Sequence, residues 1–146
     1  MLHPPPPPNA NMRRLQIDLP DDLTSPRRAR RAVQHLLRGD GDRYLADALL
    51  LTSELVTNAV VHASGGCTLN GSFDPGRDVL TVEVKDRSAA IPTLGPSGRA
   101  RDIGGRGLRI VDRIARRWGT ARTPTGKTIW FEVGERGHGV RRHVNG

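Results

Sequence analysis

Hydrophobic residues recur with two different periods along this 146-residue chain, and the period changes several times. Alternation of apolar and polar residues predicts strands over 14–19, 67–73, 79–86 and 128–133, with a further short strand near 120. Helical spacing predicts helices over 24–38, 43–63 and 107–118. Helices grouped beside antiparallel hairpins predict an α+β fold, a two-layer α/β sandwich in which helices cover one face of a sheet.

Both ends of the chain are predicted to lie outside this folded unit. Five consecutive prolines, Pro4 to Pro8, favour extended polyproline II, so residues 1–12 are expected to form a disordered arm. Residues 135–146 alternate Gly, Arg and His and are expected to form a flexible basic tail, which leaves one domain over 13–134.

The longest apolar run, 48–51, is far shorter than the roughly 20 residues of a membrane span, and no secretory signal follows the start. A cytoplasmic protein is therefore expected.

Charge is the most pronounced bulk property of the sequence. Lysine and arginine total 23 against 15 acidic residues, which gives a net charge of +8 and a pI near 11.2. That balance is typical of proteins with acidic partners such as nucleic acids. All but two of the basic residues are arginine, however, and a GC-rich genome produces that bias without selection for binding, so both explanations stay open. The lone cysteine, Cys67, excludes an internal disulfide and a cysteine-built zinc site.

The second predicted helix carries the first candidate site residues. Glu54 and Asn58 are four positions apart and therefore share one side of the helix. Their neighbours on that side, Leu50, Leu51 and Val61, are apolar, and a helix that is apolar nearly all round is expected to be buried. A carboxylate and an amide in such surroundings are costly unless paired, so they mark a candidate site. An ordinary buried hydrogen-bonded pair, or a less buried side of the helix, explains the same residues.

A glycine-rich segment, 103–108, opens the third predicted helix. Its sequence, Ile-Gly-Gly-Arg-Gly-Leu, lets the backbone approach a ligand closely, and the helix start offers unpaired N–H groups to an anion. The segment matches neither a P-loop nor a dinucleotide-binding fingerprint, and glycines before a helix also serve as plain turns. The arginines expected on the outer side of that helix, at 109, 113, 116 and 117, are more typical of a solvated face than of a docking site.

Two further residues are candidates by position alone. Asp86 ends an apolar strand and is followed by a long loop, 87–104, rich in Gly, Pro, Ser and Arg. A carboxylate there can accept a hydrogen bond from an exocyclic amine, although aspartates are common in ordinary turns. His62, eight residues after Glu54, by itself indicates only the end of a helix. The histidines show no metal-ligand spacing, and no Ser–His–Asp arrangement can be defended.

Taken in order, these segments resemble the GHKL superfamily of ATPases and kinases. Residues 54–63, Glu-Leu-Val-Thr-Asn-Ala-Val-Val-His-Ala, resemble its N-box in the form found in anti-sigma factor serine kinases of the SpoIIAB/RsbW type. Asp86 lies where the adenine-binding aspartate of that family is expected, 105–111 resembles the second glycine box, and 126–131 resembles the closing strand. The resemblance covers about 13–134. It implies a Bergerat ATP-binding fold, with a mixed, mostly antiparallel sheet and ATP held between the helix layer and a mobile lid.

The resemblance also implies a role for each matching residue. Glu54 would be the general base, Asn58 would hold Mg²⁺, and Asp86 would take the adenine amino group with support from Thr128. The other matching positions would lie near the phosphates of ATP: His62, Gly105, Arg106, Gly107 and Leu108. The implied reaction is transfer of the γ-phosphoryl group of ATP to a serine of an anti-anti-sigma (STAS-type) partner, by a protein that also sequesters a sigma factor. A homodimer is implied as well.

One motif departs from the family pattern. The first glycine box of the family reads Asp-x-Gly-x-Gly, whereas residues 86–90 read Asp-Arg-Ser-Ala-Ala and lack both glycines. An ATP-binding serine kinase and anti-sigma factor is therefore one hypothesis, favoured by Glu54 and Asn58. A nucleotide-binding or degenerate regulatory binding module without kinase activity is the alternative, favoured by the missing glycines. Direct DNA binding, which rests on charge alone, ranks last.

Overall fold

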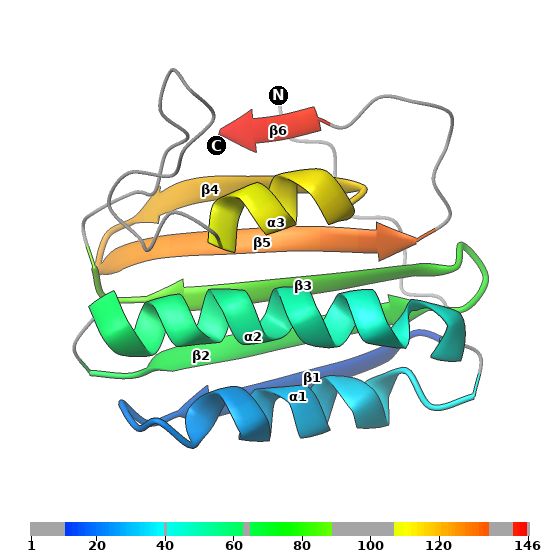
Figure 1. Cartoon of the computed structure of the whole chain (residues 1–146), viewed down its shortest axis with the longest axis horizontal. Helices are drawn as coiled ribbons and strands as arrows, with labels where there is room; N and C mark the ends of the chain where they lie inside the picture. Colours follow the sequence, from blue (N-terminus) through cyan, green and yellow to red (C-terminus); the bar gives the residue numbers. More distant parts are fainter. Residues whose placement is uncertain (1–10, 40, 63–64, 89–106, 135–141, 146) are drawn as a thin grey trace.

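The computed structural model describes residues 11–39, 41–62, 65–88, 107–134 and 142–145. The strands in these residues are β1 (Arg13–Leu19), β2 (Cys67–Asp74), β3 (Val79–Asp86), β4 (Arg117–Thr123), β5 (Gly126–Gly134) and β6 (Arg142–Asn145). The helices are α1 (Ser25–Leu36), α2 (Leu45–His62) and α3 (Gly107–Ile114), with a short 3₁₀ helix, η1 (Asp42–Tyr44), before α2. Over the described residues the sheet order is β1-β2-β3-β5-β4-β6, and every neighbouring pair is antiparallel except β4 and β6 (Figure 1). The predicted α+β fold with a mixed, mostly antiparallel sheet is confirmed.

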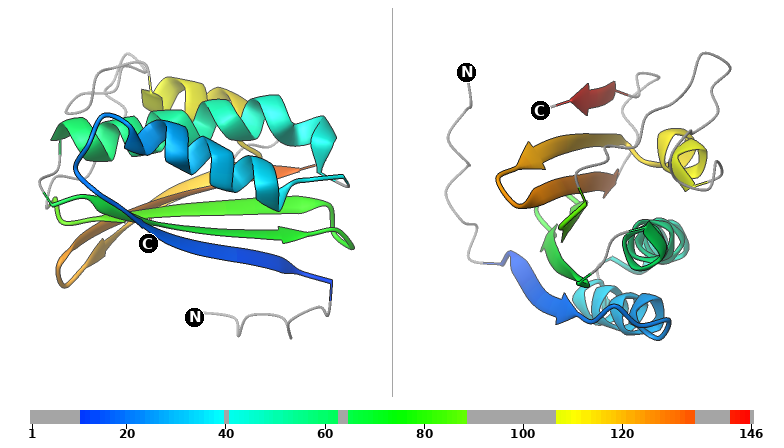
Figure 2. Two further views of the ribbon diagram at one scale, coloured as in Figure 1. Left: turned by 90° about the horizontal axis from the view of Figure 1, so that it is seen from below. Right: turned by 90° about the vertical axis from the view of Figure 1, so that its left-hand side faces the viewer.

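The helices α1, α2 and α3 lie on one face of the sheet (Figure 2). Alternation along each strand decides which side chains meet them, because successive strand residues point to opposite faces. In β1, Leu15 and Ile17 pack against the core, while Gln16 between them is exposed. The hydrophobic core therefore lies between the sheet and the helix layer, and its largest fully buried side chains include Trp118, Phe73 and Phe131.

The helix α2 occupies the middle of the helix layer and contacts both other helices. Leu51 and Leu55 on its inner side are fully buried, but Leu50 and Val61 are 40% and 60% exposed. The prediction of a helix buried nearly all round is therefore wrong, because the sheet, α1 and α3 leave one stripe of α2 uncovered by the described residues. The stretch Asp42–Val61 is long and apolar enough to cross a membrane, but core helices of folded domains meet the same test.

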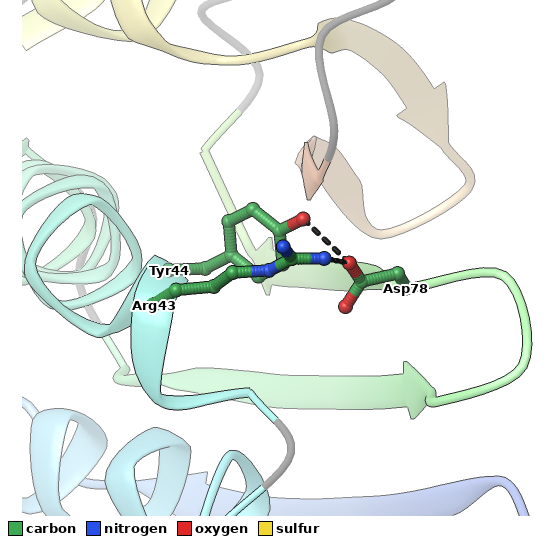
Figure 3. Close-up of polar contacts among 3 residues, drawn as sticks. All are labelled: Arg43, Tyr44 and Asp78. Atoms are coloured by element: carbon green, nitrogen blue, oxygen red, sulfur yellow. Dashed lines mark hydrogen bonds and ion pairs between the residues drawn. The ribbon is translucent and has the colours of Figure 1, made fainter.

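The start of α2 is tied to the turn between β2 and β3. Arg43 and Tyr44 both contact the carboxylate of Asp78, and the Tyr44 hydroxyl donates to Oδ2 at 2.7 Å (Figure 3). Asp78 adopts a left-handed φ of 59°, a conformation that aspartate tolerates better than most residues. The contact fixes where along the sheet α2 begins. It therefore also fixes the positions of Glu54 and Asn58, which lie nearer the other end of this helix.

The third helix is shorter than predicted. Instead of continuing to 118, α3 ends at Ile114, and the chain enters β4 at Arg117. The helix stops where the Arg116 N–H donates to the Glu132 carbonyl at 2.8 Å, which begins the pairing with β5. Trp118 is buried, and its position fits both the helical spacing of the apolar residues before it and the alternation of β4. The sequence pattern at this residue therefore does not distinguish a longer helix from the start of a strand.

The tail was also predicted incorrectly in part. Residues 142–145 form β6, which pairs in parallel with β4, so the expected flexible tail over 135–146 is wrong for these four residues. Their sequence, Arg-His-Val-Asn, shows no alternation, and the pairing is explained by the backbone N–H and C=O groups that the edge of β4 offers. Residues 1–10 of the expected arm, 135–141 of the tail and 89–104 of the loop lie outside the described residues.

Candidate functional site

The segments that carry the candidate residues meet at one end of the domain. The helix α2 ends there, β3 ends there at Asp86, β5 begins there at Gly126, and α3 begins there at Gly107 (Figure 1). Because β3 and β5 are antiparallel neighbours, the last residue of one lies beside the first residues of the other. The fold thus gathers four separate sequence motifs at the same end of the helix and sheet layers.

Asp86 has the most completely defined surroundings in the site. Its side chain is 3% exposed, and its Oδ2 atom lies 3.0 Å from the Nζ atom of Lys127. Its Oδ1 atom accepts hydrogen bonds from Lys127 Nζ at 3.1 Å and from the Ser88 backbone N–H at 2.8 Å. The contact with Ser88 is that of an ordinary aspartate turn. An ordinary aspartate turn does not include a buried ion pair, so the contact with Lys127 distinguishes Asp86 from a turn residue.

Gly126 explains why Lys127 reaches Asp86. A Cβ atom on Gly126 would lie 2.0 Å from the Asp86 carbonyl oxygen and 2.6 Å from the Arg87 Cα atom. Only a glycine allows the start of β5 to approach the end of β3 so closely. The register then places Lys127 opposite Asp86, on the side of the sheet that faces the core.

Thr128 is not the residue opposite Asp86, and its predicted support of the adenine contact stays a prediction. Thr128 is opposite Lys85, one position before Asp86, and neighbours along a strand point to opposite faces of the sheet. Lys127, to which the sequence prediction gave no role, is the β5 residue that pairs with Asp86. The sequence held only part of the signal: counting back by two from the core residue Ile129 places position 127 on the core side, but it does not show that Asp86 lies opposite.

Glu54 and Asn58 lie one turn apart on α2, and both are half-buried. The Nδ2 atom of Asn58 is buried and has no hydrogen-bond partner among the described residues. An ordinary hydrogen-bonded pair, the alternative explanation for these residues, therefore does not account for Nδ2. A buried polar atom without a partner is unfavourable in a folded protein, which makes this amide a candidate for contact with a ligand.

Asn58 fits the metal-binding role that the resemblance implies. The oxygen and nitrogen of an amide exchange places when the group rotates by 180°, so the buried position can equally hold an oxygen. Mg²⁺ prefers oxygen ligands and commonly takes only one or two of them from protein, with phosphates and water supplying the rest. The described residues contain no cluster of three or more His, Cys, Asp or Glu that could hold a metal.

Two of the five predicted phosphate-binding residues, and the side chain of a third, lie outside the described part of the chain. Gly105 and Arg106 precede α3 there, and the side chain of His62, the last residue of α2, is likewise not described. Gly107 is the first residue of α3, as predicted. The Leu108 side chain is fully buried in the core. Only its backbone N–H, one of the unpaired groups at a helix start, is therefore available to an anion.

A cavity of about 430 Å³ lies beside Asp86 at the end of the sheet. Its described lining includes Cys67 and Asp86 but neither Glu54 nor Asn58, so it does not by itself form the predicted cleft between helices and sheet.

Cys67 is opposite Asp86 in the sheet. Burial, and secondarily the negative charge of Asp86, raises the pKa of the Cys67 thiol to about 11. The thiol is therefore protonated at neutral pH and is not a nucleophile of the site.

Comparison with known protein families agrees with this arrangement. A family model described as a histidine kinase-like ATPase domain matches residues 19–133. The matched range begins at the last residue of β1 and ends within β5, so it contains every candidate residue named above. None of the curated proteins compared with the chain matches it. Because the family model covers most of its length, the chain belongs to the family of histidine kinase-like ATPase domains.

Proposed function

We propose that this protein is an ATP-binding serine-protein kinase that acts as an anti-sigma factor in the cytoplasm. In this proposal it sequesters a sigma factor, works as a homodimer, and phosphorylates an anti-anti-sigma (STAS-type) partner. The observation that carries the proposal is the buried Nδ2 atom of Asn58, which has no hydrogen-bond partner in the described part of the chain and lies at the same end of the domain as Asp86. Family membership supports ATP binding. The resemblance of residues 54–63 to the N-box of anti-sigma factor kinases supports the finer role.

Each residue of the site has a distinct task in the proposed reaction. Asp86 would accept a hydrogen bond from the adenine amino group, and Asn58 would hold Mg²⁺. When bound, Mg²⁺ neutralises charge on the phosphates of ATP. Glu54, one turn before Asn58, would accept the proton of the partner's serine hydroxyl while that oxygen bonds to the γ-phosphorus. The bond from the γ-phosphorus to the oxygen of the β-phosphate breaks, and ADP leaves.

The nucleotide-binding part is tested by calorimetric titration with ATP and ADP, each with and without Mg²⁺. We expect saturable binding that Mg²⁺ strengthens and that Asp86→Ala abolishes. Asp42→Ala is the matched control, because Asp42 is exposed and lies before α2, away from the candidate site. Absence of binding by the wild-type chain at millimolar nucleotide would refute this part of the proposal.

The kinase part is tested by phosphoryl transfer from radiolabelled ATP to a purified STAS-type partner. Glu54→Ala should abolish transfer but leave nucleotide binding largely intact, because the general base does not hold the nucleotide. Glu83→Ala is the matched control, because Glu83 lies on the opposite face of the sheet from the core. Undiminished transfer by Glu54→Ala would exclude this residue as the base.

A second candidate function is a regulatory binding module that holds a partner without phosphorylating it. Two observations favour it: Asp86 is already paired with Lys127, and residues 88–90 lack the family's glycines. This function predicts that the wild-type protein binds a sigma factor in a pull-down but transfers no phosphoryl group from ATP to a STAS-type partner. The phosphoryl-transfer assay on the wild-type protein separates it from the kinase.

A further inference from the structure

Lys127 and Asp86 form an ion pair inside the candidate site. The Nζ atom of Lys127 lies 3.0 Å from Oδ2 of Asp86 and 3.1 Å from its Oδ1 atom, and the two side chains are 2% and 3% exposed. Lysine is almost never buried this completely unless it is paired. Because the close backbone approach at Gly126 sets the register, the pair is fixed by the fold and is not a chance surface contact.

The pair leaves Asp86 little capacity to accept a hydrogen bond from a ligand. An ionised carboxylate has about four acceptor positions on its two oxygens. On Oδ1, one position accepts from the Ser88 N–H and another from Lys127, and on Oδ2 one position faces Lys127. An amino group that approaches Asp86 must therefore compete with a charged donor that is already in place.

We propose that Lys127 is an internal competitor at the nucleotide site, which the amino group of the base must displace from Asp86. The inference rests on the proposed function, because it requires that Asp86 binds the base. Both contacts have an ionised acceptor, but only the lysine donor carries a charge, so the neutral amino group of a base cannot replace the attraction between opposite charges that holds Lys127 to Asp86. The exchange is unfavourable, so Lys127 lowers the affinity of the wild-type chain for adenine nucleotides.

Substitution of Lys127 tests the inference directly. Lys127→Met removes the charge and the donor but keeps an unbranched side chain of similar length. We expect this variant to bind ADP with Mg²⁺ at least about tenfold more tightly than the wild type in calorimetric titration, because a neutral donor no longer competes with a charged one. Lys127→Arg keeps the charge and should bind as weakly as the wild type. Lys85→Met is the matched control, because Lys85 is the other lysine of the chain and its side chain is 54% exposed.

A second measurement uses the wild-type chain and needs no variant that folds. Because the chain contains two lysines, labelling of lysine with ¹³C at the ε carbon gives two NMR signals. Saturation with ADP should move the Lys127 signal, because its Nζ atom loses the contact with Asp86, and should leave the Lys85 signal unchanged. A Lys127 signal that does not move at saturation overturns the proposal, even if Lys127→Met fails to fold.

The outcomes separate this inference from the function on which it rests. Tighter binding by Lys127→Met, together with the shift of the Lys127 signal, supports the competitor. If the wild type binds ADP and Lys127→Met binds it equally or less tightly, Lys127 is not a competitor, although the nucleotide site stands. If neither protein binds ADP at millimolar concentration, the nucleotide site itself is refuted, and the role of Lys127 is refuted with it.

Discussion

Replacing Gly126 by alanine should force apart the two strands at the centre of the candidate site. The added Cβ atom would lie 2.0 Å from the Asp86 carbonyl oxygen and 2.6 Å from the Arg87 Cα atom. Both are backbone atoms, which cannot rotate out of the way as the end of a side chain can. Since real Cβ contacts essentially never fall below 3.0 Å, the start of β5 must move away from β3 by at least the missing 1.0 Å, the difference between 3.0 and 2.0 Å.

A shift of that size lowers the free energy of unfolding in two ways. Overpacking of a filled site costs about 1–3 kcal/mol. The same movement lengthens the 3.0 Å contact between Lys127 and Asp86 towards about 4 Å, where a hydrogen bond is largely lost. Breaking a buried ion pair outright costs about 3–5 kcal/mol, and stretching it should cost part of that amount. We therefore expect Gly126→Ala to lose about 3–6 kcal/mol in total.

Urea unfolding followed by tryptophan fluorescence measures this loss. Gly71→Ala is the matched control, because its Cβ atom would meet Leu36 Cδ2 at 3.0 Å and Leu15 Cγ at 3.3 Å, which belong to side chains that can move. We expect this control to lose less than about 1 kcal/mol. If Gly126→Ala loses no more stability than Gly71→Ala, the site does not depend on the close approach of the β3 and β5 backbones at Gly126. The claim that this approach places Lys127 beside Asp86 would then be wrong.

Three other substitutions test the remaining contacts. Raising the pH from about 8 to about 10.5 should destabilise the wild type more than Cys67→Ala, because the unfolded thiol loses its proton near its ordinary pKa of 9.0 while the folded thiol keeps it until about 11. Equal losses in urea unfolding of the two proteins would contradict a buried Cys67. Tyr44→Phe removes the hydroxyl that donates to Asp78 at 2.7 Å and should cost about 1 kcal/mol in the same assay; no change would show that this contact does not hold α2. Trp118→Phe removes the indole N–H that donates to Asp112 at 2.9 Å and should cost about 1–3 kcal/mol by circular dichroism of urea unfolding; a neutral result would mean that the bond adds nothing in the core.

Local patterns predicted most of the fold, whereas contacts between distant segments were not predictable from them. The strands 13–19, 67–74 and 79–86 were found within one residue at each end, because alternation is a property of each segment alone. The end of α3 was missed because Trp118 fits both periods, and β6 was missed because its pairing comes from the edge of β4.

The candidate site follows the same division between local and distant information. Asp86 was identified from its position at the end of an apolar strand and from its place in a family motif. Its partner Lys127 was not identified, because that step needs two facts that no local window contains: β5 lies beside β3, and position 127 is opposite position 86. The unpaired amide of Asn58 also needs coordinates, since it is a property of everything that surrounds the helix.

The sheet order has a consequence for how the domain folds. β3 and β5 are neighbours, although α3 and β4 lie between them in the chain, and the ion pair joins residues 41 positions apart. Such a contact forms only after a long loop has closed, so the site is absent from partly folded chains that lack β5 in its place. A ligand held at Asp86 would bind the native state alone, and by mass action it would raise the melting temperature as its concentration rises. Cellular nucleotide would then act on this protein as a folding ligand that stabilises the finished sheet.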